Sequence, residues 1–158
     1  MKIASWNVNS LKVRLPQVLD WINLNQPDVL CLQETKQNND NFPYDVFEKI
    51  GLFSYHNGQN TYNGVAIISN KELIDIQFDI PNFYDEQKRL ISGIYPNDED
   101  PKFRVISAYI PNGQSINSDK FEYKMNWLKS FINFLQTKID GIENIITGDF
   151  NIAPTILD

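Results

Sequence analysis

The sequence predicts an α+β fold in which helices pack on largely antiparallel strands. Short apolar segments recur along the chain, two longer segments show helical spacing of apolar residues, and Asn-Gly, Asn-Lys and Pro-Asn turn signals separate the strands of the middle part. The chain has 158 residues, of which 42% are hydrophobic, so it can bury a core and is close to the usual size of one domain. We therefore expect a single domain over residues 1–158.

The first part of the chain has the pattern of a β-α-β unit. Ile3–Trp6 and Asp28–Leu32 are short apolar segments typical of buried strands. A helix is predicted between them, and Pro16 suits its first turn because proline lacks the N–H that a helix start leaves unpaired. The apolar residues expected on one face of this helix are Leu15, Val18, Leu19 and Ile22.

The remaining elements are a series of strands, one long helix and a last strand. The predicted strands are Phe53–Tyr55, Gly64–Ser69, Leu73–Phe78, Leu90–Tyr95 and Arg104–Tyr109. Their short connections favour antiparallel pairing. A helix is predicted from Ser118 or Asp119 to about Ile139, with Gly141 as its stop, followed by a strand at Asn144–Thr147. Its expected core stripe comprises Phe121, Met125, Leu128, Phe131, Ile132 and Leu135.

The bulk properties limit both compartment and partners. The sequence contains no apolar run long enough to predict a membrane span, and its N-terminus turns polar before a signal-peptide core could form. We therefore expect a soluble cytoplasmic protein, associated with the nucleoid in a prokaryote. Cys31 lies in an apolar run and is expected to be a buried, unpaired thiol in a reducing compartment. The net charge of −6 argues against binding nucleic acid by bulk electrostatics, so a phosphate substrate would need a divalent metal.

Polar side chains recur where predicted strands end. Asn7, Glu34 and Tyr109 stand at or just after strand ends, and Asp149 and Asn151 follow the last strand. Strand ends from one side of a sheet can meet in a single pocket, where an aspartate can ligate a cation or move a proton and an asparagine can hold a ligand. Each residue also has a structural alternative. The Gly-Asp-Phe-Asn segment could form an Asx turn whose side chains bond their own backbone, and Asn7 could simply be a turn residue. Glu34 could be a surface carboxylate and Tyr109 a core aromatic residue.

Five segments that contain these residues occur in one order: Ser5–Asn9, Leu32–Lys36, Tyr62–Ala66, Tyr109–Gly113 and Gly148–Asn151. In this order they closely resemble the exodeoxyribonuclease III type of AP endonuclease, within the endonuclease/exonuclease/phosphatase superfamily. The resemblance covers the whole chain, and the Leu-Gln-Glu-Thr-Lys and Gly-Asp-Phe-Asn-Ile-Ala-Pro-Thr segments are its most specific parts. It implies the N-terminal portion of a four-layer α/β sandwich, with two mixed, largely antiparallel sheets flanked by helices.

The resemblance also implies roles for the strand-end residues. Glu34 would ligate the catalytic Mg²⁺ or Mn²⁺, with Asn7 as a further ligand or as the group that orients it. Asp149 would handle the proton of the nucleophilic water or of the leaving group, Asn151 would orient the phosphate or the nucleophile, and both count as candidate metal ligands. Tyr109 would donate its hydroxyl to a phosphate oxygen. Weaker candidates for contact with the DNA backbone are Lys36, Arg89 and Asn112.

The sequence departs from the family's pattern in what it lacks. The Ser-Asp-His signature of the family's second half, and the Asp that pairs with its histidine, have no counterpart in these 158 residues, so we expect an incomplete domain. The one histidine, His56, is expected to be a polar loop residue without a catalytic role. If each half of the family fold contributes mainly to one sheet, this chain would leave an apolar sheet face uncovered and could self-associate through it.

Three functions fit these observations. The first is metal-dependent phosphodiester hydrolysis on double-stranded DNA, at abasic sites or 3′ ends, in base excision repair, by a longer parent protein. This chain would carry the metal-binding half of that parent and is not expected to need activity of its own. The second is a non-catalytic remnant or binding module of the same fold. The third is a phosphatase that acts on a phosphoester other than DNA. The Leu-Gln-Glu-Thr-Lys and Pro-Asn-Gly segments favour the DNA-repair branch.

Overall fold

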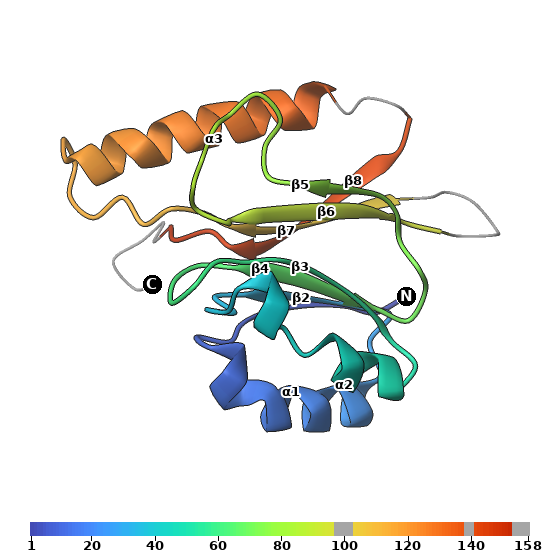
Figure 1. Cartoon of the computed structure of the whole chain (residues 1–158). Coiled ribbons are helices and arrows are strands. Elements are labelled where there is room, and N and C mark those ends of the chain that lie inside the picture. The colour runs from blue at the N-terminus through green and yellow to red at the C-terminus, as the bar shows by residue number, and fades with distance from the viewer. Residues whose placement is uncertain (97–102, 138–140, 153–158) are drawn as a thin grey trace.

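A computed structural model describes residues 1–96, 103–137 and 141–152. Its strands form two four-stranded sheets that pack face to face (Figure 1). The first sheet has the order β1 (Ile3–Asn7), β2 (Val29–Gln33), β4 (Val65–Ser69) and β3 (Phe53–Asn57). The second has the order β5 (Ile74–Phe78), β6 (Leu90–Tyr95), β7 (Phe103–Tyr109) and β8 (Glu143–Asp149).

Helices cover the outer faces of the two sheets. Figure 1 shows α1 (Leu11–Asn25) and α2 (Tyr44–Lys49) beneath the first sheet and α3 (Asp119–Thr137) above the second. A short 3₁₀ helix, Asn39–Asn41, precedes α2. The predicted α+β class and the layered sandwich are therefore confirmed. In the described part of the chain, no helix is both long and apolar enough to cross a membrane.

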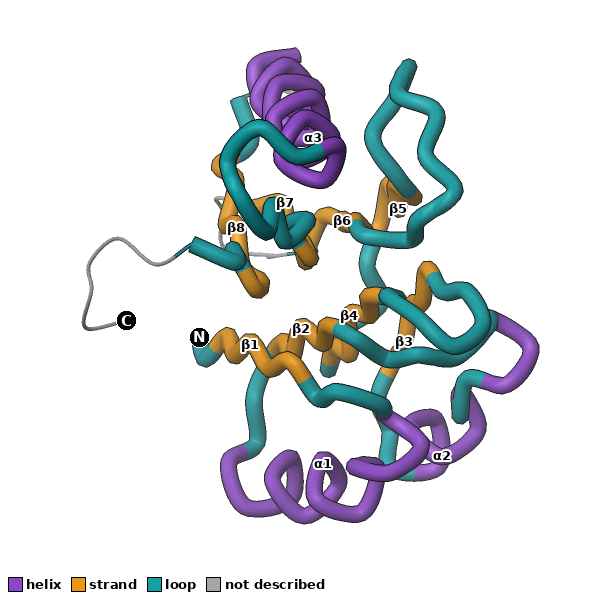
Figure 2. The backbone as a smooth tube through the Cα atoms, turned by 90° about the vertical axis from the view of Figure 1, so that its left-hand side faces the viewer, coloured by secondary structure: helices purple, strands orange, loops and turns teal. Residues whose placement is uncertain are grey.

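A β-α-β unit stands at the same edge of each sheet. Helix α1 joins β1 to β2 and α3 joins β7 to β8, and both strand pairs are parallel. The other neighbouring strands pair antiparallel. The prediction for short connections holds for β3–β4, β5–β6 and β6–β7, whereas the successive strands β4 and β5 lie in different sheets. Figure 2 looks along the layers and shows β1 and β8 at the same side of the molecule, one above the other. Parallel pairing places the C-terminal ends of each pair side by side, which positions the site described below.

The core consists of three apolar layers, because each sheet is covered on both faces. Strands β2, β4 and β6 are buried at every position. Along β2, Val29 and Cys31 pack between the sheets, whereas Leu30 and Leu32 pack against α1. Cys31 is fully buried and unpaired, as expected, and burial raises the pKa of its thiol to about 12. It is therefore an apolar packing residue.

The expectation of an uncovered sheet face is wrong for the described residues. Four strands enter each sheet, because the chain passes from the first sheet to the second between β4 and β5. Each sheet then covers the inner face of the other. The less buried strands are the edge strands of both sheets, β1, β3, β5 and β8. Ile74 of β5 is 47% exposed and Ile146 of β8 is 37% exposed, so the apolar surface that remains lies along the edges of the sandwich.

Helix α1 begins before its predicted start. Pro16 lies inside the helix, which starts at Leu11. The Leu11 amide donates to the Thr35 carbonyl at 3.0 Å, and the Ser10 amide donates to the Glu34 carbonyl at 2.7 Å. These contacts hold the first turn against the loop after β2, so tertiary bonds outweigh the preference of proline for the first turn.

Two further helix predictions need correction. Helix α2 and the 3₁₀ helix before it were not predicted, because both are too short to show a helical period. Helix α3 starts at Asp119 as predicted, and the predicted end at Ile139 lies outside the described residues. Met125 and Ile132 of its expected core stripe are exposed. The buried side chains are Trp127, Phe131 and Phe134, on a face rotated from the predicted one.

Candidate active site

The ends of four strands bring together four polar side chains, Asn7, Glu34, Tyr109 and Asp149, which we call the carboxylate cluster. The Nδ2 of Asn7 donates to Glu34 Oε1 at 2.9 Å and to Asp149 Oδ2 at 2.8 Å. The hydroxyl of Tyr109 donates to the same Glu34 Oε1 at 2.8 Å. The cluster thus joins both sheets, since Asn7 and Glu34 belong to the first and the other two to the second.

Asn7 presents its amide nitrogen to the two carboxylates. Its other end is fixed, because Asn7 Oδ1 accepts a hydrogen bond from the backbone amide of Asn9 at 3.0 Å. This bond assigns the orientation of the side-chain amide. In this arrangement Asn7 orients Glu34 and Asp149 and does not turn an oxygen toward them.

Glu34 is held in a strained backbone conformation and by three side-chain donors. Its φ is 53°, in the left-handed region that a residue other than glycine seldom adopts. Lys36 Nζ lies 3.0 Å from Glu34 Oε2, and the Glu34 side chain is 19% exposed. Burial raises the pKa of this carboxyl, but the hydrogen bonds from Asn7, Lys36 and Tyr109 together outweigh burial and lower the pKa below its ordinary value. Glu34 is therefore an anion available to a cation.

Tyr109 remains a hydrogen-bond donor over the physiological pH range. Burial, and then the hydrogen bond to the Glu34 carboxylate and its charge, raise the pKa of Tyr109 to about 12. The neutral hydroxyl can therefore donate to an anionic oxygen.

The turn after β8 is fixed from several sides. Asp149 Oδ1 accepts from the Asn151 amide at 3.0 Å, which is the Asx-type contact considered above as a structural alternative. The other oxygen of Asp149 faces Asn7, so the turn and the cluster coexist. Asn151 Nδ2 donates to the Ile110 carbonyl at 2.8 Å, and Lys124 Nζ donates to the Asn151 carbonyl at 2.7 Å. Gly148 has φ +147°, and a Cβ there would lie 1.8 Å from the Ala108 carbonyl oxygen.

Beside the carboxylate cluster lies a cavity of about 460 Å³. Arg89 forms part of its wall, with its guanidinium carbon 4.7 Å from the centre of the Tyr109 ring and its Nη1 donating to the Tyr109 carbonyl at 3.1 Å. Asn112 lines the same cavity, and its Oδ1 accepts from the Gln114 amide at 2.9 Å. Lys36 lies at the cluster itself, through its ion pair with Glu34. The three weaker candidates thus surround the cluster.

His56 is not the polar loop residue that the sequence predicted. It lies in β3, is 3% exposed and stacks on Phe42 with ring centres 4.2 Å apart. Its Nε2 is 2.8 Å from Thr35 Oγ1, and burial lowers the pKa of His56 to about 3. Because β3 extends further than predicted, the histidine becomes a neutral packing residue behind the loop that carries Glu34.

The sequence profile of the endonuclease/exonuclease/phosphatase family matches residues 4–158. The chain belongs to this family. Exodeoxyribonuclease III of Haemophilus influenzae is 35% identical over 164 residues, an alignment that covers all of this chain and 60% of the relative. The chain thus spans about 60% of that protein's length.

Solved structures of family members agree with this assignment. A 3′ phosphatase from Neisseria, bound to a product DNA hairpin, is 40% identical, with a TM-score of 0.92 over all of this chain and 60% of its own. An AP endonuclease from Archaeoglobus fulgidus is 38% identical, with a TM-score of 0.90 over the same shares. These TM-scores show that the fold of this chain matches the corresponding part of both structures.

Three side chains that contact residues of the site or the residues behind them were not predicted from the sequence. Lys124 contacts the turn after β8, Gln87 contacts Arg89, and Thr35 contacts His56. Lys124 lies on a helix and showed no local signal, because its partner is 27 residues away. Gln87 stands two residues before Arg89 in a loop, and only the loop's fold brings the two together.

The donor groups of the carboxylate cluster fit a hard cation. Within the described residues there is no group of three or more His, Cys, Asp or Glu that could hold a metal ion. The cluster instead offers the Glu34 carboxylate, with the Asp149 carboxylate on the same Asn7 amide. Mg²⁺ often takes one or two carboxylates and fills its remaining positions with water and substrate phosphate. This donor set fits Mg²⁺ or Mn²⁺ better than Zn²⁺, which favours histidine and cysteine.

Proposed function

We propose that this chain forms the metal-binding part of a DNA nuclease that hydrolyses phosphodiester bonds at abasic sites or at 3′ ends, in base excision repair. The observation that carries the proposal is the carboxylate cluster, in which one asparagine amide holds two carboxylates from different sheets. Relatives named exodeoxyribonuclease III, AP endonuclease and 3′ phosphatase support the choice of DNA. The cytoplasm, with the nucleoid in a prokaryote, is the compartment where such an enzyme would work.

Glu34 and Asn7 would hold the metal end of the site. Glu34 ligates Mg²⁺ or Mn²⁺ through its carboxylate, and Asn7 keeps that carboxylate and Asp149 in register. When bound, the cation polarises a phosphoryl oxygen and neutralises charge that develops there. The hydrogen bonds that lower the pKa of Glu34 keep it ionised for this role.

The second-sheet residues of the cluster would act on the substrate. Asp149 takes the proton of the attacking water or supplies one to the leaving oxygen, a role that requires a carboxylate within hydrogen-bond reach. Tyr109 donates its neutral hydroxyl to a phosphate oxygen. Asn151 keeps the turn that carries Asp149 in place through its bond to the Ile110 carbonyl, and orients the phosphate or the nucleophile.

Positive charge at the rim would offset the acidic composition of the chain. Arg89 and Lys120 line the cavity, and Lys36 lies beside Glu34. Local cations can bind backbone phosphates even when the net charge is −6, because salt screens charges further away than about 8–10 Å. Lys36, Arg89 and Asn112 are accordingly the residues proposed to contact the DNA backbone.

The experiment that tests the function is incision of a labelled duplex that carries one abasic site. The 158-residue chain, shown to be folded by circular dichroism, is incubated with Mg²⁺ and then with a chelator, and a duplex with a 3′ phosphate is assayed in parallel. We expect cutting or phosphate release that the chelator abolishes. A folded chain that binds this DNA without any turnover would show either that the chemistry needs the family's Ser-Asp-His segment or that the chain is a binding module, and turnover only on a small phosphoester would favour a non-DNA phosphatase.

A further inference from the structure

Arg89 is a buried cation whose partners are neutral. Arg89 is only 9% exposed to solvent. Its Nε and Nη2 donate to Gln87 Oε1 at 2.9 and 2.6 Å, and its Nη1 donates to the Tyr109 carbonyl. Among the described residues, Arg89 forms no ion pair with a carboxylate. A buried charge is costly unless an opposite charge or strong hydrogen bonds compensate it.

The guanidinium is also confined by rings. Its central carbon lies 4.7 Å from the centre of the Tyr109 ring and 6.0 Å from that of Tyr123. These contacts, together with three hydrogen bonds, leave the group little rotational freedom. Its charge, which no carboxylate of the described residues pairs with directly, is thus held at the wall of the cavity beside the carboxylate cluster, where an anion could approach.

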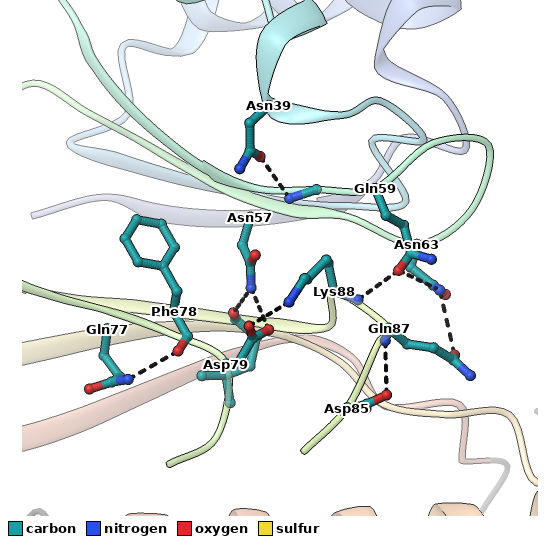
Figure 3. Close-up of polar contacts among 12 residues, drawn as sticks. Asn39, Asn57, Gln59, Asn63, Gln77, Phe78, Asp79, Asp85, Gln87 and Lys88 are labelled. Carbon is teal, nitrogen blue, oxygen red and sulfur yellow. Dashed lines mark hydrogen bonds and ion pairs between the residues drawn. The ribbon is translucent and has the colours of Figure 1, made fainter. Parts of the chain in front are cut away.

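Gln87, the acceptor for two of these bonds, is itself fixed by loops from both sheets. The backbone amide of Gln87 donates to Asp85 Oδ1 at 2.9 Å, and Asp85 Oδ2 accepts from the Tyr123 hydroxyl at 2.6 Å. Figure 3 shows Asn63 reaching toward both Gln59 and Gln87, and Gln59 Oε1 accepting from the Lys88 amide at 2.7 Å. The loop after β3 and the loop before β6 therefore hold one another where Gln87 meets Arg89.

We infer that Gln87 is a positioning residue, which fixes the Arg89 guanidinium through a neutral acceptor so that its full positive charge faces a phosphate group in the cavity. A glutamate at this place would accept the same two bonds but would cancel the charge, whereas an alanine would leave the charge and remove the restraint. The inference rests on the proposed function, because it is the phosphodiester substrate that would supply the phosphate.

The test measures phosphate binding directly, without metal or turnover. Inorganic phosphate is titrated into the folded chain while the Nε–H resonance of Arg89 is followed by NMR, assigned by its loss in Arg89→Lys. We expect this resonance to shift with phosphate in the native chain. Gln87→Ala should weaken phosphate binding about tenfold, the effect of losing hydrogen bonds to a charged group, and should speed exchange of the Nε proton.

A second variant and a control separate positioning from stability. Gln87→Glu keeps both acceptor bonds, so the Nε–H resonance should stay protected while phosphate binding weakens because the charge is compensated. Gln77→Ala removes a glutamine whose side-chain amide, among the described residues, donates to the carbonyl of its neighbour Phe78 on β5, and this variant should bind phosphate as the native chain does. The inference is overturned if the native resonance does not respond to phosphate, or if folded Gln87→Ala binds phosphate as tightly as native. Incision of abasic DNA by the same preparations tests the proposed function separately.

Discussion

The carboxylate cluster and the cavity wall around Arg89 differ in how their charges are neutralised. In the cluster, Glu34 receives bonds from Asn7 and Tyr109 and also pairs with the cation of Lys36. At the wall, the partners of Arg89 among the described residues are the neutral oxygens of Gln87 and Tyr109 and two aromatic rings. One side therefore offers negative charge to a cation, and the other offers positive charge to an anion.

Tyr109 stands between these two regions and contacts both. Its hydroxyl donates to Glu34, while its carbonyl and ring contact Arg89. The proposed function requires both kinds of charge within a short distance, since hydrolysis of a phosphodiester with a bound cation would use an anion for the cation and a donor for the phosphate. The net charge of −6 is therefore a property of the whole chain and does not describe the charge at the site.

The largest effect is expected from Glu34→Ala, which removes the anion of the cluster. We expect loss of Mg²⁺-dependent activity with the fold intact, because Glu34 is the carboxylate proposed to ligate the cation. Activity on abasic DNA is measured against Mg²⁺ concentration, with thermal unfolding as the check on folding. Glu48→Ala, an exposed glutamate on α2, serves as control and should behave like the native chain. Unchanged incision by Glu34→Ala in Mg²⁺ would remove Glu34 from the ligand set.

A smaller effect on rate is expected from Asp149→Asn. The asparagine keeps one of the two acceptor bonds, from Asn7 or from the Asn151 amide, because it has a single side-chain oxygen, and it cannot take up a proton at neutral pH. We expect kcat to fall by about 10²–10⁴-fold, the range for a lost general acid or base, while DNA binding is retained. Single-turnover kinetics and fluorescence anisotropy measure the two quantities. Asp40→Asn, at an exposed aspartate, is the control, and native-like turnover by Asp149→Asn would exclude the proton-transfer role.

Substitution at the cavity wall should change binding more than rate. Arg89→Ala removes the buried guanidinium, and we expect KM for DNA to rise about tenfold to a hundredfold, with kcat less affected, because a charged hydrogen-bond donor to phosphate is lost. Steady-state kinetics at two salt concentrations measure this change, and the salt dependence should become shallower. Arg14→Ala, on an exposed position of α1, should leave KM unchanged. A change in kcat alone would place Arg89 in the chemical step.

The smallest effect concerns stability and lies behind the cluster, at His56. Its folded pKa of about 3 is below the ordinary value of 6.5, so the unfolded chain binds the proton first as pH falls. The stability from the neutral histidine is complete above about pH 6.5 and declines toward pH 3, by at most about 1.4 kcal/mol per pH unit. Urea unfolding at pH 7 and pH 5 measures this loss. His56→Gln should show a smaller decline over that interval, and an equal decline would show that His56 does not titrate on unfolding.

Much of the fold was predictable because the signals are local. The strand segments Val29–Leu32 and Val65–Ile68 are apolar throughout, which is typical of strands covered on both faces. The start of α3 follows Ser118, whose hydroxyl accepts from the Phe121 amide. The candidate site was predictable in its residue types, since polar residues at strand ends converge wherever parallel strands pair. Resemblance to the family added the order in which those residues occur.

Other features could not be read from local pattern. The start of α1 at Leu11 depends on carbonyls of the loop after β2, and the burial of His56 depends on Phe42 and Thr35. Met125 and Ile132 fit a helical period as well as the residues that are buried, and only the docking angle of α3 on its sheet selects the buried face.

The amino-acid sequence by itself determined where the strands and long helices form and which chemical groups stand at their ends, because period and turn chemistry act between near neighbours. The tertiary structure alone decided which of those groups touch. Asn7 and Asp149 are 142 residues apart, and one amide joins them only because two β-α-β units end at the same edge of two packed sheets. Contacts over such separations depend on strand pairing and on the packing of whole layers, which no local pattern of residues specifies.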